Sequence, residues 1–346
     1  MKKSVSFFRK YAVATAWVYF TLLFGWLLAY LILGDRFAYL GFVNILAFYL
    51  FFPLPLAGLV AVLTRRREII IGTILGAAIF LILWGPLFLP RLSPPPKGGN
   101  PHPSLTVMTF NALGLQEHTD PLVEIIQEVD ADVVFLQEIN TRHAAALQNE
   151  LTAAYPYQVL DPVDGVSGMG VISRYPLRET GEQLPLEWVG APQVFEMDFE
   201  GVPVTLLNFH ALSLQFYPLE GANLNFRYRE AQARVLADFA AHAPGPLVVA
   251  GDANTTSLSD AYDMITAGQL CDAFQEAGWG LGHTFPGSKE PGSHRFHVGA
   301  WYIPQWLARI DYIFVSSEWG VAAARVAPFD GVSDHRGVVA ELVLGE

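Results

Sequence analysis

Three long apolar runs open the chain and constrain its fold more than any other feature. They are 22, 25 and 21 residues long, contain no charged side chain, and cover Ala12–Leu33, Tyr39–Leu63 and Ile69–Leu89. Because a helix rises about 1.5 Å per residue, each run is long enough to cross a hydrocarbon core about 30 Å thick. We therefore expect three transmembrane helices within residues 1–92. Pro53 and Pro55 should kink or locally unwind the second one.

Basic residues beside these runs predict their orientation. They precede the first run and separate the second from the third, at Lys2, Lys3, Arg9, Lys10 and Arg65–Arg67. The loop between the first two runs has only Arg36, beside Asp35. Since loops rich in lysine and arginine stay in the cytoplasm, the N-terminus should be cytoplasmic. Three crossings then give a multi-pass cell-membrane protein whose C-terminal domain is extracytoplasmic.

The two parts of the chain differ in charge. Residues 1–100 hold ten of the 21 lysines and arginines but only two of the 33 acidic residues. The rest of the chain therefore carries 11 basic and 31 acidic residues, a formal net charge of −20. A domain with this charge repels a polyanion, which disfavours nucleic acid as a partner without closing that alternative. Cys271 is the single cysteine, so an intrachain disulfide and a cysteine-based zinc site are both ruled out.

A short linker divides the chain at residues 93–103, with the sequence SPPPKGGNPHP. Consecutive prolines hold a chain extended, and at roughly 3 Å per residue this segment reaches about 30 Å at most. The domain at residues 104–346 should therefore stay close to the bilayer. Its predicted strands and helices are interspersed without a strict βαβ alternation, which favours an α/β fold with layers packed around sheets.

Polar residues follow the apolar strands of this domain at their ends. They are Asn111, Glu138, His210, Asp252, Asn254, Asp311, Asp334 and His335. A carboxylate in such a place is poorly suited to packing, because an unpaired buried charge is costly. Oxygen donors in a cluster suit Mg²⁺, with Mn²⁺ or Ca²⁺ as alternatives. The pattern predicts a divalent metal beside a phosphate.

Seven short motifs carry a family resemblance. In chain order they are Thr109-Phe110-Asn111, Leu136-Gln137-Glu138, Ile172-Ser173-Arg174-Tyr175-Pro176, Asn208-Phe209-His210, Gly251-Asp252-Ala253-Asn254, Arg309-Ile310-Asp311-Tyr312 and Ser333-Asp334-His335. This ordered set resembles the endonuclease/exonuclease/phosphatase superfamily, the DNase I-like proteins, which also include inositol-polyphosphate phosphatases and neutral sphingomyelinases. The resemblance covers residues 105–345 and none of the first hundred. It implies a four-layer sandwich of two mixed β-sheets flanked by helices, preceded here by three transmembrane helices.

The resemblance also implies a metal site. Glu138 would be the principal ligand, assisted by Asn111. Asp334 or Asp311 would lie near the ion. A hard cation there would neutralise charge that builds on the transferring phosphoryl group.

Catalytic roles follow from the same resemblance. Asp311 and His335 match a carboxylate–imidazole pair in which the aspartate orients the ring. Asp252 would hold the attacking water, while Asn254 and His210 would donate hydrogen bonds to phosphate oxygens. An unperturbed imidazole has a pKa near 6.5 and an unperturbed aspartate one near 3.9, so His335 is predicted as the general base. Asp252 stays open as the alternative.

Two further features bear on the substrate. Arg229, near the start of a helix predicted from Arg227 to Ala241, is predicted to contact a phosphate, although a solvated helix face explains it equally well. Two loops, Phe216–Leu219 and the tryptophan- and tyrosine-rich segment His294–Trp306, should frame the substrate. Trp and Tyr favour the bilayer interface, so the second loop could contact lipid; the alternative is that it packs on the domain's own core.

These observations predict a membrane-anchored, extracytoplasmic, divalent-metal-dependent phosphoesterase. Its substrate would be a lipid-linked phosphate or pyrophosphate, or a phosphodiester headgroup, and its partner the lipid bilayer. The first alternative is a metal-dependent endonuclease or exonuclease on the outer face of the membrane. A non-catalytic binding protein of the cell envelope is the second alternative, although it would have no need of the complete residue set.

Overall fold

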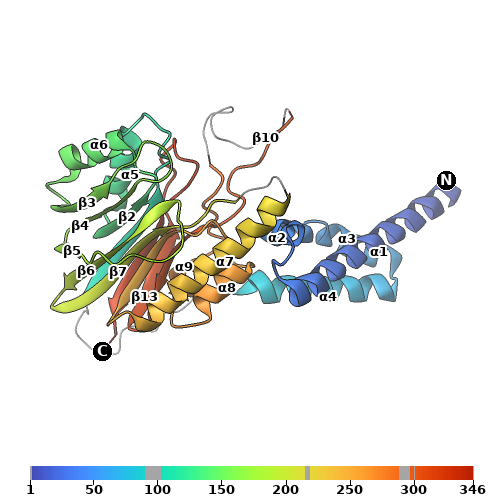
Figure 1. Ribbon diagram of the computed structural model, residues 1–346. Coiled ribbons are helices and arrows are strands. Elements are labelled where there is room, and N and C mark those ends of the chain that lie inside the picture. Colours follow the sequence, from blue (N-terminus) through green and yellow to red (C-terminus); the bar gives the residue numbers. More distant parts are fainter. Residues whose placement is uncertain (1, 90–102, 215–218, 288–296, 300, 346) are drawn as a thin grey trace. The chain divides into compact units, whose positions relative to one another are not determined.

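The protein is described by a computed structural model that covers residues 2–89, 103–214, 219–287, 297–299 and 301–345. The chain forms two compact units, Met1–Leu89 and Pro90–Glu346 (Figure 1). The predicted linker at residues 93–103 lies outside the described residues apart from Pro103. Its extended conformation therefore stays a prediction.

The first unit is helical. Its elements are α1 (Lys2–Leu33), α2 (Ala38–Ile45), η1 (Ala47–Phe51), α3 (Leu54–Thr64), α4 (Arg67–Trp84) and η2 (Gly85–Phe88). Three stretches are long and apolar enough to cross a membrane, namely Arg9–Leu33, Ala47–Thr64 and Arg67–Phe88. They suggest membrane anchoring. The second apolar run is interrupted as predicted, because the helix stops before Pro53 and α3 begins directly after it.

Small and polar residues organise the interior of this first unit. Gly72 faces the Phe20 ring so closely that a Cβ atom there would lie 2.7 Å from it. The Asn44 side chain accepts from the Trp26 indole at 3.0 Å and donates to Asp35 at 2.8 Å. Glycine contacts and satisfied polar groups are the means by which apolar helices pack without a hydrophobic driving force between them.

The second unit contains two six-stranded mixed sheets. Sheet one has the order β13 (Trp319–Val326), β14 (Val338–Leu344), β1 (Ser104–Asn111), β2 (Val133–Gln137), β4 (Met169–Ser173) and β3 (Tyr157–Asp161). Sheet two has the order β5 (Leu177–Glu179), β6 (Gly190–Phe199), β7 (Val202–His210), β8 (Leu247–Asp252), β12 (Asp311–Val315) and β9 (Cys271–Asp272). A separate hairpin pairs β10 (His297–Val298) with β11 (Trp301–Tyr302).

These sheets and their helices form the predicted four-layer sandwich. An apolar core lies between the sheets, with Phe135 from sheet one and Phe195 from sheet two. Helices α5 (Asp120–Val129) and α6 (Thr141–Leu151) pack on the outer face of sheet one. On the outer face of sheet two lie α7 (Leu219–His242) and α8 (Asp260–Thr266), and the short α9 (Ala273–Ala277) follows β9. Figure 1 shows α5 and α6 on one side of the strands and α7 and α8 on the other. The predicted fold class is confirmed.

The helix predicted from Arg227 to Ala241 begins earlier than expected. α7 starts at Leu219, so Arg227 and Arg229 lie in its interior and not in its first turn. The prediction followed the alanine- and leucine-rich face, whereas the preceding Glu220–Asn225 segment lacks that pattern and is helical because Ala222, Asn225 and Phe226 are buried against the domain.

Candidate active site

Strand pairing brings the predicted site residues to one end of the sandwich. In sheet one, Asn111 at the end of β1 is paired with Gln137 at the end of β2. In sheet two, Asp252 is paired with His210 on one side and with Asp311 on the other. Polar side chains from five strands therefore meet at a single edge, as the positions of these residues at strand ends predicted.

Glu138 and Asp252 share one hydrogen-bond donor although they come from different sheets. The Asn111 side-chain nitrogen donates to Glu138 Oε1 at 3.1 Å and to Asp252 Oδ2 at 3.2 Å. The Gly114 backbone N–H donates to the other Glu138 oxygen at 3.3 Å. His210 Nε2 lies 3.9 Å from Glu138 Oε1 and 3.5 Å from Asp252 Oδ2. The two carboxylates thus face the same small space.

The backbone of Glu138 is in the left-handed region, with φ of 56°. Along β2, one face carries Val133, Phe135 and Gln137, which are all buried. In a regular strand, the Glu138 side chain would therefore point to the opposite face. The left-handed turn instead brings the Glu138 carboxylate to Asn111. Such a conformation in a non-glycine residue costs about 1–3 kcal/mol and is found at functional sites. Asn254 has a φ of 49° and is the second strained residue of the site.

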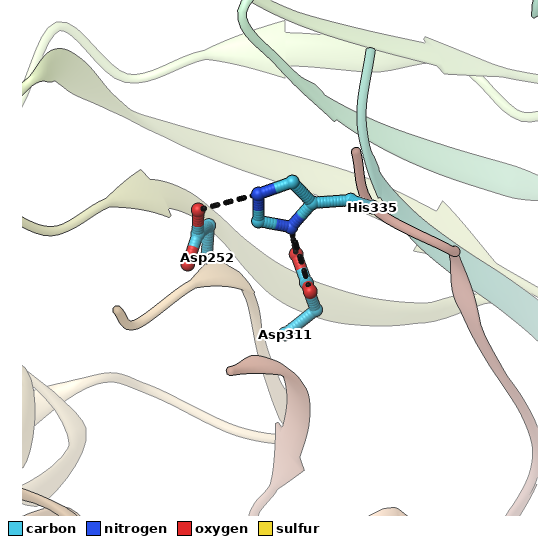
Figure 2. A group of neighbouring side chains, drawn as sticks. All are labelled: Asp252, Asp311 and His335. Atoms are coloured by element: carbon cyan, nitrogen blue, oxygen red, sulfur yellow. Dashed lines mark hydrogen bonds and ion pairs between the residues drawn. The ribbon is translucent and has the colours of Figure 1, made fainter. Parts of the chain in front are cut away.

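Asp252, Asp311 and His335 form a group of potential ligand residues, with one ligand atom from each lying within 4.8 Å of the other two. The Asp311 carboxylate contacts His335 Nδ1, with its two oxygens at 2.9 and 3.1 Å. On the other side of the ring, His335 Nε2 lies 3.8 Å from Asp252 Oδ2 (Figure 2). All three side chains are buried. Asp311 therefore holds the ring by Nδ1 and leaves Nε2 on the side of Asp252, while the orienting role in catalysis stays a prediction.

Burial strongly shifts two groups of the site. Desolvation, together with the His335 charge, lowers the pKa of His210 to about 3, so this ring is neutral near pH 7. Desolvation and the adjacent Asp311 carboxylate raise the pKa of Asp252 to about 8. Burial likewise raises the pKa of Glu138, against the opposing hydrogen bond from Asn111. The site therefore concentrates carboxyl groups whose ionised forms are disfavoured by burial and, for Asp252, by the adjacent Asp311 carboxylate.

His335 shows the opposite balance. Burial by itself would lower its pKa, but the carboxylates of Asp311 and Asp252 outweigh burial and hold the pKa well above its ordinary value. A ring that keeps its proton at neutral pH donates hydrogen bonds and is a poor proton acceptor. The electrostatics therefore remove the preference for His335 that unperturbed pKa values gave. Because its own pKa is raised to about 8, Asp252 would act as general base near pH 7 only if a bound cation kept it ionised. The assignment itself stays a prediction.

The residues of this site fit a divalent cation. Glu138 and Asp252 direct oxygens at one amide, and no lysine or arginine in the described part of the chain forms an ion pair with either. Carboxylate oxygens are the ligands that hard cations prefer, and a bound cation would favour the ionised forms that burial disfavours. Asn111 holds both carboxylates, while its own side-chain oxygen accepts from the Leu113 N–H at 3.1 Å. Its predicted role as a ligand stays a prediction.

Three other predicted residues lie around this centre. Asp334 is close to the His335 ring, with Oδ1 3.9 Å from Nε2. The Asn254 N–H donates to Asp252 Oδ1 at 2.8 Å, and its side chain donates to Ala211 O at 3.1 Å. Arg229 is buried and donates to the Asn254 backbone carbonyl. The described contact of Arg229 therefore supports Asn254, and its phosphate contact stays a prediction.

Sequence reasoning gave no role to a buried amide network directly behind the site. Gln137 Nε2 donates across the two sheets to Asn208 Oδ1 at 2.7 Å, and also to Thr109 Oγ1 at 3.1 Å. The Asn208 amide donates to Gln193 Oε1 at 3.1 Å and to two backbone carbonyls of sheet one. The available signal was a polar residue inside an otherwise apolar, fully buried strand.

Sequence reasoning also gave no role to two further residues, Arg309 and Ser333, that hold site residues in place. Arg309 forms a buried two-bond ion pair with Asp272, at 3.0 and 2.6 Å, and thereby anchors the start of β12 next to Asp311. Ser333 donates to Asn111 O at 2.8 Å and accepts from the His335 N–H at 3.0 Å. Both residues belong to motifs quoted above, where only their acidic and imidazole neighbours received roles.

The two loops predicted to frame the substrate are described only in part. Residues 215–218 and 288–296 lie outside the described residues. Of the aromatic segment, Trp301 on the β10–β11 hairpin is 82% exposed and Tyr302 40%. Trp306 instead packs against Phe329, with ring centroids 5.0 Å apart. Lipid contact by this segment stays a prediction.

A family model supports the assignment that the motifs and geometry indicate. The model of the Endonuclease/Exonuclease/phosphatase family matches residues 108–335, which is more than half of the chain. The chain belongs to this family. It is therefore a phosphoester hydrolase of the phosphoesterase and nuclease group. The family is divalent-metal-dependent, which agrees with the acidic and histidine cluster of this member.

Solved structures share the fold of this family member. Humanized D. rerio TDP2 is 20% identical with a TM-score of 0.53, covering 69% of this chain and 98% of its own. D. rerio TDP2 with a single strand DNA product is 18% identical, with the same coverage and a TM-score of 0.52. The Bacteroides vulgatus family protein is 20% identical, with coverage of 70% and 99% and a TM-score of 0.52. Curated proteins gave no significant match.

Proposed function

We propose that this family member is a membrane-anchored phosphoesterase that hydrolyses a lipid-linked phosphate, pyrophosphate or phosphodiester outside the cytoplasm. The proposal rests on the presence, in one chain, of apolar helices and of a phosphoesterase-type site. The first unit has three apolar helices long enough to cross a membrane, and the second has the Glu138–Asp252–His335 site. Mg²⁺ is the proposed metal, with Mn²⁺ or Ca²⁺ as alternatives.

The residues divide the chemistry among them. A cation held by Glu138 with Asp252 or Asp334 would neutralise charge on the phosphoryl group and disfavour protonation of the carboxylates. Asp252 holds the attacking water and accepts its proton. His335, kept protonated by Asp311 at 2.9 Å, donates from Nε2 to a phosphoryl oxygen. The neutral His210 and the Asn254 amide add hydrogen bonds, and such preorganised donors are worth about a hundredfold to a thousandfold in rate each.

A direct assay separates this proposal from the nuclease alternative. The alternative is favoured by the D. rerio TDP2 structure that contains a single strand DNA product. Against it stands the formal net charge of −20 in residues 101–346, which opposes binding of a polyanion. Detergent-solubilised full-length protein with Mg²⁺ should release phosphate from polyprenyl pyrophosphate or cleave a phospholipid headgroup. Efficient cutting of plasmid DNA with inert lipids would replace our proposal by the nuclease.

The proposed orientation has its own test, because the only cysteine lies in the second unit and is exposed. A membrane-impermeant thiol reagent should label Cys271 in intact cells. A Cys271→Ser variant should show no labelling, and permeabilised cells should give no further increase. Labelling that appears only after permeabilisation would place the second unit in the cytoplasm.

A further inference from the structure

Five exposed apolar side chains lie on segments that contact the active site. They are Leu115, Val163, Val166, Leu186 and Leu224, and we call them the collar. The second unit has nine strongly exposed large apolar side chains among its described residues, so more than half belong to the collar. Exposed apolar side chains gathered at one place mark a surface that binds a partner or a membrane.

The first two collar segments are tied to Glu138 and its neighbour. Leu115 follows Gly114, whose N–H donates to Glu138 Oε2 at 3.3 Å. The Val163 N–H donates to Ile139 O at 3.1 Å. The two segments also touch each other, because a Cβ atom on Gly114 would meet the Gly165 carbonyl oxygen at 1.8 Å. Val166 follows Gly165 directly in this loop.

The remaining two segments are tied to His210 and Asn254. Leu186 lies three residues before Val189, whose N–H donates to the His210 backbone carbonyl at 3.1 Å. Leu224 is 67% exposed on α7, and its neighbour Asn225 donates to Ser213 O in the loop that follows His210. The same helix carries Arg229, which donates to Asn254 O. Each collar residue thus lies on a segment that contacts a residue of the site or its immediate chain neighbour.

The charges beside the collar specify the kind of surface it fits. Glu117, Asp164 and Glu187 are exposed next to it. Of the exposed basic residues near it, Arg142 is paired with Glu117 at 3.4 Å, and Arg227 lies three residues after Leu224 on α7. This combination does not attract an anionic surface, so binding must come from burial of apolar side chains. A bilayer is the partner that fits, because the first unit of the same chain has three helices long and apolar enough to cross one.

We infer that the collar inserts into the outer layer of the bilayer, so that the site takes the phosphate of a substrate whose hydrocarbon chains remain in the membrane. This inference rests on the proposed function and narrows its substrate to one presented by a bilayer. Val and Leu side chains enter the interfacial region while the acidic neighbours stay in water. Binding then depends on apolar area and is not weakened by salt.

A labelling experiment tests the contact without using activity. The full chain with Cys271→Ser is reconstituted in phosphatidylcholine vesicles, and an environment-sensitive fluorophore is attached to Leu115→Cys or Leu224→Cys. The control is Tyr157→Cys, because Tyr157 is exposed but paired with Ser173, at the end of sheet one far from Gln137. Brominated lipids should quench the two collar labels and leave the control bright, at low and at high salt. Equal quenching at all three positions, or none at the collar, would overturn the inference.

A rate comparison then links the collar to the substrate. Leu115→Asp and Val163→Asp are assayed in the same vesicles on a bilayer-borne phospholipid or lipid phosphate and on soluble bis-p-nitrophenyl phosphate. Each change should lower the ratio of the first rate to the second about tenfold, whereas Tyr157→Asp should leave the ratio unchanged. An unchanged ratio in the collar variants would refute the inference. If no variant or parent hydrolyses lipid, the proposed function fails, while the quenching result still decides whether the collar contacts the bilayer.

Discussion

The space between the two sheets has an apolar half and a polar half, and the same strands line both. Along β2, Val133 and Phe135 belong to the apolar core, and the next residue on that face is Gln137. The same change occurs along four other strands, where two apolar core residues are followed on the same face by a polar one. These series are Leu105, Val107 and Thr109; Val204, Leu206 and Asn208; Val248, Ala250 and Asp252; and Val315, Ile313 and Asp311.

The comparison shows how the site is built. A strand places every second side chain on one face, so the active site is the core of the sandwich continued with polar residues. The apolar half stabilises the fold through burial. The polar half instead concentrates desolvated carboxylates and two strained residues, Glu138 and Asn254. Stability and activity should therefore respond differently to changes in the two halves.

The largest expected effect is at Glu138 in the polar half. Glu138→Ala should lower kcat/KM about a thousandfold, because a principal charge of the site is lost. The free energy of unfolding should not fall, since the change removes a buried carboxylate with a raised pKa from the protein. Steady-state kinetics and thermal denaturation of the same preparation check both. A drop in Tm that accounts for the lost activity would contradict the prediction.

Phe195 in the apolar half should give the opposite result. Phe195→Ala leaves a cavity at a fully buried position and should cost about 3–5 kcal/mol of unfolding free energy. The kcat of the protein that remains folded should stay within about threefold of the parent, because no site residue is changed. Denaturant unfolding and active-site titration measure the two quantities. A stable variant with low kcat would show that the halves are not separable.

Metal addition sharpens the same contrast. A divalent cation at a hundred times its Kd should stabilise the native state by about 2.7 kcal/mol, provided it binds only the folded protein. Thermal denaturation should show this shift for the parent and for Phe195→Ala, and a much smaller one for Glu138→Ala. Chelator should reverse it. An equal shift in Glu138→Ala would mean that the cation binds elsewhere.

The smallest effects are expected at the boundary between the halves. Gln137→Met or Asn208→Leu leaves a buried amide without its 2.7 Å partner and should cost about 1–3 kcal/mol. Each should also lower kcat about tenfold by loosening the position of Glu138 or His210. The double variant should be less destabilised than the sum of the two, while its kcat stays low.

Gln158→Met is the matched control for this boundary. Its amide bonds to Leu147 O and Tyr155 O, away from the site, so it should change stability alone. If kcat of the double variant recovered together with its stability, the network would have a purely structural role.

Much of the architecture and part of the site could be predicted from the amino-acid sequence. The length and hydropathy of the apolar runs were enough to locate the helices. Each helix satisfies its backbone hydrogen bonds within itself and needs no distant partner. Asn111, Asp252 and Asp311 could be selected because Asn111 and Asp252 end apolar strands and Asp311 begins one. The order of the motifs predicted the four-layer sandwich, which the two mixed sheets confirm.

How these residues act on one another follows from the folded arrangement and could not be predicted from the sequence. The left-handed turn of Glu138, the proton held on His335 and the burial of Arg229 each depend on groups that are far away in the chain. A pKa follows from desolvation and from neighbouring charges, and neither is set by local sequence. The collar likewise becomes visible only when folding brings three loops and α7 to the same site. Distances between segments, and the burial that folding imposes on them, are properties of the assembled sandwich.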